Sequence, residues 1–154
     1  MPTAVKPKWS SVNTLTITLA SLANNASRQS TMVDNSSTRY DRIHVYAKVT
    51  VGTNPTANST IAFWLIKGDN PASSSYRSDG AGATDASITW RNARLLDMIL
   101  VPVNTSNAEY YRDFVIDNPG PEWGIIVTNN TGVSLNATAG NHFIKWIGEN
   151  MEIQ

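Results

Sequence analysis

The sequence predicts an all-β fold, a single-domain antiparallel β-sandwich. Short runs in which apolar and polar residues alternate fill the chain from Thr14 to Ile153, and this period of two buries one face of each strand. The runs are separated by loops made almost entirely of Ser, Thr, Asn, Gly and Pro, the residues that reverse a chain in turns. No long stretch shows a capped helical period, so we expect little helix.

The chain divides into an arm and one folded domain. Residues 1–12 hold two prolines, two lysines and Trp9 without apolar periodicity, which predicts an extended N-terminal arm. Residues 13–154 carry the strand-like runs and are predicted to form the sandwich. A chain of 154 residues is long enough for one domain with a single core.

The first strands are predicted from alternation. Residues 14–20 place leucine and isoleucine on one face and threonine on the other, and Met32 with Val33 forms a short strand between two polar loops. The clearest alternation spans residues 40–51. Its apolar face holds Ile43, Val45, Ala47, Val49 and Val51, and its polar face holds His44, Tyr46, Lys48 and Thr50.

Residues 60–67 are apolar on both faces, which predicts a strand that lies centrally or has its outer face covered. The turn residues Asn54 and Pro55 precede this strand. We therefore expect residues 40–51 and 60–67 to pair as a hairpin.

Residues 68–85 form the longest loop, with a serine triplet at 73–75. Loops beyond about a dozen residues are usually functional or disordered, because ordering them costs backbone entropy that few contacts repay. This loop is the first candidate for a binding surface. Its candidate residues are Tyr76, Arg77 and Asp79.

The second half of the domain resumes the strand pattern. Residues 87–90 and 95–103 are strand-like, although residues 91–98 also fit one or two helical turns, and Pro102 marks an edge or an end. The last strands are expected at residues 110–117, 124–128 and 143–148.

Composition excludes several classes of partner and chemistry. Twelve basic and twelve acidic side chains give a formal net charge of zero, so no uniform field attracts nucleic acid or an anionic membrane. The longest apolar run, residues 61–66, is far shorter than the roughly twenty residues that span a bilayer. The absence of cysteine excludes disulfides, thiolate nucleophiles and Cys-ligated zinc.

The sequence carries no catalytic constellation. His44 and His142 lie far apart without a second ligand at metal-binding spacing, so we expect solvent-exposed or loop histidines. The aspartates fall in or near loops but form no calcium-binding run, and no serine lies in a nucleophile elbow. We therefore expect no enzyme, no cofactor and no metal site.

The aromatic residues leave two interpretations open. The tryptophans are Trp9, Trp64, Trp90, Trp123 and Trp146. Such rings can stack on sugars, or they can pack in the core and at subunit interfaces. In the arm, Lys6 and Lys8 accompany Trp9, whose ring would insert into a groove of a neighbouring subunit unless the terminus simply frays.

Several segments resemble small virion proteins of tailed bacteriophages. They are Asp117-Asn118-Pro119-Gly120-Pro121-Glu122-Trp123-Gly124-Ile125, Asn129-Asn130-Thr131-Gly132, Gly140-Asn141-His142, Ala4-Val5-Lys6-Pro7-Lys8-Trp9 and Arg77-Ser78-Asp79-Gly80-Ala81-Gly82. The resemblance touches nearly the whole chain, but its motifs are structural turns rather than catalytic residues.

The resemblance implies a non-enzymatic capsid decoration or cement protein that stabilises the outer surface of a phage head. It implies a jelly-roll-like sandwich, a homotrimer, and the major capsid protein as the partner. It places the protein in the virion, assembled in the host cytoplasm. Lys6, Lys8 and Trp9 are the expected contact residues of the arm.

The alternative is a glycan-binding module on a phage head or tail. It would use aromatic residues in loops 68–85 and 137–141, and mutation of Tyr76 would abolish its binding. The number of copies in the particle distinguishes the three functions. Abundant copies on the head would indicate a decoration protein, a few copies on the tail a glycan-binding module, and absence from the particle an enzyme.

Overall fold

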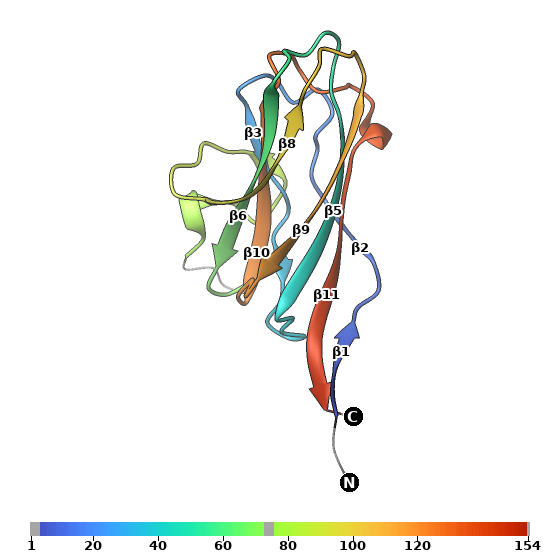
Figure 1. Ribbon diagram of the computed structural model, residues 1–154. Helices are drawn as coiled ribbons and strands as arrows, with labels where there is room; N and C mark the ends of the chain where they lie inside the picture. The colour runs from blue at the N-terminus through green and yellow to red at the C-terminus, as the bar shows by residue number, and fades with distance from the viewer. Residues whose placement is uncertain (1–3, 73–75, 154) are drawn as a thin grey trace.

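The computed structural model describes residues 4–72 and 76–153 and shows two antiparallel sheets packed face to face, which confirms the β-sandwich (Figure 1). The strands are β1 (Val5–Trp9), β2 (Asn13–Leu15), β3 (Ser27–Gln29), β4 (Val33–Asp34), β5 (Arg42–Thr50), β6 (Ser59–Gly68), β7 (Ala86–Ser87), β8 (Arg94–Val101), β9 (Glu109–Asp117), β10 (Glu122–Asn130) and β11 (Phe143–Ile153). Two short 3-10 turns, η1 (Ser78–Gly80) and η2 (Ala139–Asn141), complete the described structure.

The strand order is that of a jelly roll. One sheet runs β1-β11-β5-β9, with β2 also paired to β11, and the other runs β7-β3-β10-β6-β8, with β4 also paired to β10. When β2, β3, β5, β6, β8, β9, β10 and β11 are numbered one to eight, the sheets read 1-8-3-6 and 2-7-4-5. This interleaving of first and last strands is the double Greek key of jelly-roll sandwiches. The predicted jelly-roll-like fold is confirmed.

The predicted hairpin between residues 40–51 and 60–67 is wrong. β5 pairs with β11 and β9, whereas β6 pairs with β10 and β8 in the other sheet. The connection therefore crosses from one sheet to the other. Turn residues show that a chain reverses, but they do not say whether the next strand stays in the same sheet.

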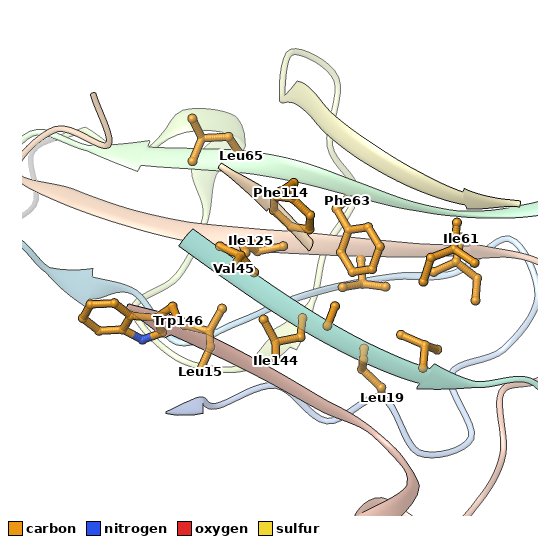
Figure 2. Close-up of a cluster of buried hydrophobic side chains, with 14 of the residues drawn as sticks. Leu15, Leu19, Val45, Ile61, Phe63, Leu65, Phe114, Ile125, Ile144 and Trp146 are labelled. Carbon is orange, nitrogen blue, oxygen red and sulfur yellow. The ribbon is translucent and has the colours of Figure 1, made fainter. Parts of the chain in front are cut away.

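The core lies between the sheets and follows the predicted alternation. Figure 2 shows Val45 and Ile144 of one sheet facing Phe63 and Ile125 of the other. These four side chains are completely buried, and Phe63 also contacts Phe114, with ring centroids 5.3 Å apart. Burial of each such side chain contributes about 1.5–3 kcal/mol to folding.

The apolar outer face of β6 is covered, as the sequence predicts. β6 lies in the middle of its sheet, between β10 and β8. On its outer face, Ile66 and the neighbouring Ile126 form a second buried cluster with Ala81. Met32, Trp64, Ile88, Trp90 and Ala93 pack against this cluster. Residues 81–85 and 88–93, on either side of β7, therefore form a covering layer over part of the sheet, while β7 itself joins the sheet beside β3.

Several strands differ from the predicted lengths. β2 is shorter than residues 14–20, because the carbonyl of Thr16 accepts the N–H of Thr31 and the N–H of Thr18 donates to Asp85 instead of continuing the ladder with β11. β3 was not expected, since its Ser, Arg and Gln side chains carry no apolar alternation. β8 is extended, which excludes the helical turns considered for residues 91–98, and it ends directly before Pro102 at the edge of its sheet.

The arm is extended, but its described part is a strand of the fold. β1 pairs with the second half of β11 in antiparallel register, from Val5 opposite Ile153 to Trp9 opposite Glu149. The two strands form a ribbon that projects beyond one end of the sandwich, next to both chain ends (Figure 1). Residues 1–3 of the predicted arm lie outside the described residues.

Candidate interaction site

The projecting ribbon of β1 and β11 has one apolar face and one charged face. Residues directly opposite each other in an antiparallel pair share a face. Val5 faces Ile153, Pro7 faces Met151, and Trp9 follows on the same side. We call these five residues the apolar ribbon face. Val5, Trp9, Met151 and Ile153 have exposed fractions of 57%, 52%, 55% and 70%, which makes this face an unusual exposed apolar strip.

The charged face holds the two lysines that the sequence assigned to the same contact as Trp9. Lys6 lies opposite Glu152 and Lys8 lies opposite Asn150. The Nζ atom of Lys8 is 3.1 Å from Oε1 of Glu152, and both side chains are largely exposed. An ion pair of this kind contributes at most about 1 kcal/mol. The structure therefore separates Lys6 and Lys8 from Trp9 and puts them on opposite faces.

Trp9 is anchored at the base of the ribbon. Its ring centroid lies 4.8 Å from that of His44 on β5, and His44 Nε2 lies 2.7 Å from Oε2 of Glu149. Glu149 in turn is the register partner of Trp9. This three-way contact holds the indole against the sheet while leaving half of its surface exposed. The apolar ribbon face is thus presented in one orientation.

The candidate residues of the long loop have different roles. Tyr76 is exposed. Arg77 makes a two-pronged ion pair with the buried Glu122, with Nε 2.9 Å from Oε2 and Nη2 2.8 Å from Oε1, and this carboxylate raises the pKa of Arg77. Oδ1 of Asp79 accepts the backbone N–H groups of Arg91 and Asn92. Arg77 therefore holds the loop on β10, and Asp79 joins it to residues 91–92. Residues 73–75 lie outside the described structure.

The two loops of the glycan-binding alternative do not meet. Loop 68–85 leaves β6 at Gly68, whose register partner is Glu122 at the start of β10. Loop 137–141 packs near Thr50, whose hydroxyl donates to the carbonyl of Asn141, at the end of the sandwich where β10 finishes. Tyr76 and loop 137–141 thus belong to opposite ends of the sandwich.

His142 is half-buried and not a free loop residue. Its Nε2 lies 2.9 Å from the carbonyl of Asn136, and its Nδ1 accepts the N–H of Thr50 at 3.3 Å. Both contacts fit a neutral ring with the hydrogen on Nε2. Burial lowers the pKa of His142, and the charge of Lys48 acts in the same direction.

We expect His142 to make the folded state less stable as the pH falls. Its pKa is lower in the folded chain than the unfolded value of about 6.5, so between the two values the unfolded chain binds more protons. The contribution of His142 to the free energy of unfolding is complete above its unfolded pKa. It decreases as the pH falls below that value, and it stops changing below the folded pKa. Urea unfolding at pH 7, 6 and 5 measures this loss, and the variant His142→Gln should show a shallower dependence. The same slope in both proteins would contradict the assignment.

The described residues hold no group of three or more His, Cys, Asp or Glu side chains that could bind a metal ion. The helical turns described are far too short to cross a bilayer. Comparison of the sequence with protein-family models and with curated proteins gives no match.

The sequence pattern points to the arm, but the predicted strands do not include its partner, the second half of β11. Met151 and Ile153 alternate with Asn150 and Glu152, which is a strand signal. The last strand predicted from the sequence ends at residue 148. Extending the alternation beyond Gly148 would have predicted the longer β11 and with it a second apolar row.

Proposed function

We propose that this chain is a non-enzymatic virion structural protein, a capsid decoration protein that binds the outer surface of a phage head and stabilises its lattice. The observation that carries the proposal is the apolar ribbon face, which projects from the jelly roll. Among the described residues, no other apolar strip projects from the body of the domain in this way. A projecting strip of this kind suits insertion between the subunits of a shell. The major capsid protein is the proposed partner.

The energetics favour attachment by many weak contacts. Burying the exposed parts of Val5, Trp9, Met151 and Ile153 would contribute about 1 kcal/mol each. A single ribbon therefore binds weakly after the cost of association is subtracted. Association of the chain as a homotrimer, which we also propose, would present three ribbons and raise the apparent affinity through effective concentration.

Paired substitutions on the two faces of β1 test this proposal. At a protein concentration well below saturation of the head, we expect Val5→Ser with Trp9→Ser to lower the number of bound copies at least tenfold, which corresponds to about 1.4 kcal/mol of binding free energy. The matched variant Lys6→Ser with Lys8→Ser alters the same strand on its other face and should change occupancy less than about twofold. Occupancy is measured by quantitative mass spectrometry of purified heads after mixing, and circular dichroism checks that both variants fold. Wild-type occupancy of the variant Val5→Ser with Trp9→Ser would remove the apolar ribbon face from the contact.

The copy number in purified particles tests the function itself. A decoration protein should be present in hundreds of copies on the head. A handful of copies on the tail, or none in the particle, would contradict the proposal whichever surface makes the contact.

A further inference from the structure

A hollow of about 520 Å³ lies on the outer face of the sheet that contains β3, β10 and β6, at the edge of the covering layer formed by residues 81–85 and 88–93. Its position is independent of the ribbon, which belongs to the other sheet. The residues that line it are Asn25, Ala26, Ser27, Ser87, Ile88, Thr89, Trp90 and Thr128. The volume falls within the range of small-molecule sites.

Two tryptophans whose rings meet at an angle of 39° form one wall of the hollow and its support. Trp90, from the covering layer, lines the hollow, and its ring centroid lies 3.8 Å from that of Trp64, which points outward from β6. Register pairs Trp64 with Ile126 on β10, inside the second apolar cluster. Trp64 is therefore held by the sheet and in turn holds Trp90, so the wall of the hollow is a preorganised aromatic surface.

Hydrogen bonds fix the orientation of both rings. Nε1 of Trp64 donates to Oγ1 of Thr128 at 3.1 Å. Nε1 of Trp90 lies 3.1 Å from Oγ of Ser27 and 3.2 Å from Oγ1 of Thr128. Ser27 and Thr128 sit opposite each other on β3 and β10, with their hydroxyl oxygens 2.8 Å apart. Each indole N–H is thus satisfied from the sheet, and the ring faces remain for packing.

The hydroxyl pair keeps one donor for a ligand. Ser27 and Thr128 have one hydroxyl hydrogen each, and only one of the two is used in the bond between them. The indoles contribute donors and no acceptors, and the bonds among the described residues give the other hydroxyl hydrogen no acceptor. A polar donor is therefore held at the edge of the aromatic wall. Asn25 and the exposed Ser87 and Thr89 add further donors and acceptors around the hollow.

The ligand that matches these groups is a neutral sugar. A pyranose ring has an apolar C–H face that packs flat on an indole and a rim of hydroxyls that both donate and accept hydrogen bonds. All eight lining side chains are uncharged, which gives no counter-charge for an anionic ligand. We propose that this hollow, the Trp90 site, binds one ring of a neutral oligosaccharide, with the sugar face on Trp90 and its hydroxyls on Ser27, Thr128 and Asn25.

Indole N–H resonances report on the site directly. The protein is labelled with nitrogen-15 and titrated with maltopentaose, cellopentaose, chitotetraose and mannotetraose, each to about 10 mM, a range that covers weak single-ring binding. We expect at least one of these sugars to shift the Nε1 signals of Trp90 and Trp64 while leaving that of Trp9 unchanged. No shift with any of the four, or shifts confined to other tryptophans, would overturn the proposal.

Two variants separate binding from folding. Trp90→Ala should weaken binding of the responsive sugar at least tenfold. Because loss of a packed indole can unfold the chain, Thr89→Lys provides a second test, since it places a long side chain over the hollow from an exposed position. Its matched control is Thr138→Lys, an exposed residue of loop 137–141, and a further control is Tyr76→Ala. Thr89→Lys should weaken binding at least tenfold, and both controls should bind as the wild-type protein does. Binding that survives Thr89→Lys, or that is lost with either control, would overturn the Trp90 site.

Discussion

Replacing Arg77 with methionine is expected to lower the free energy of unfolding by about 3–5 kcal/mol, because it leaves a buried carboxylate without its partner. Glu122 is 2% exposed, and both of its oxygens are held by Arg77. Gly68 packs against the same carboxylate, and a Cβ at this position would overlap Oε2 of Glu122. Urea unfolding at pH 7 measures the change.

The double variant Arg77→Met with Glu122→Leu provides the control. It removes both charges and should recover most of the lost free energy, since replacing a buried ion pair by apolar groups is often close to neutral. A single variant within about 1 kcal/mol of the wild-type protein would show that Glu122 finds water or another partner. In that case Arg77 would again be a candidate binding residue.

Truncation of Trp123 is expected to be equally costly. Its side chain is completely buried between the sheets and meets Trp146 edge to face, with ring centroids 5.4 Å apart. Trp123→Ala removes this ring and leaves a cavity, so the free energy of unfolding should fall by about 3–5 kcal/mol. The measurement is the same urea titration, followed by tryptophan fluorescence and circular dichroism.

Two further variants define the cause of the Trp123 effect. The indole Nε1 of Trp123 is buried without a hydrogen-bond partner among the described residues. Trp123→Phe keeps much of the ring and removes this unsatisfied group, so it should cost less than half as much as the alanine variant. Trp9→Ala removes a ring that is half exposed and contacts His44, so it should cost only about 1 kcal/mol. A large loss with Trp9→Ala, or equal losses with phenylalanine and alanine at 123, would contradict the cavity explanation.

The pattern of apolar residues along a short segment was sufficient to predict which face of a strand is buried. The alternation in residues 40–51 predicted the inward residues of β5, and Ile43, Val45, Ala47 and Val49 are buried as expected. The two-sided apolar pattern of β6 predicted a covered outer face, which Ile66 and its cluster provide. These features depend on residues two positions apart, so the sequence contains them directly.

Neither candidate binding surface follows from such local pattern. The apolar ribbon face joins Val5 to Ile153, and the Trp90 site joins β3, β10 and the layer over β6. Each needs segments from distant parts of the chain. The sequence leaves the roles of the Trp9 and Trp90 rings open, and the structure decides which side chains surround them.

The sequence by itself determined which side of β5 is apolar and that both sides of β6 are apolar, because successive side chains of an extended backbone point to opposite faces. The tertiary structure decided which strands are neighbours: β5 and β6 lie in different sheets, β1 joins β11, and Arg77 meets Glu122. Pairing between distant strands depends on the packing of the whole chain, because each backbone ladder can form with any partner whose apolar face fits the same core.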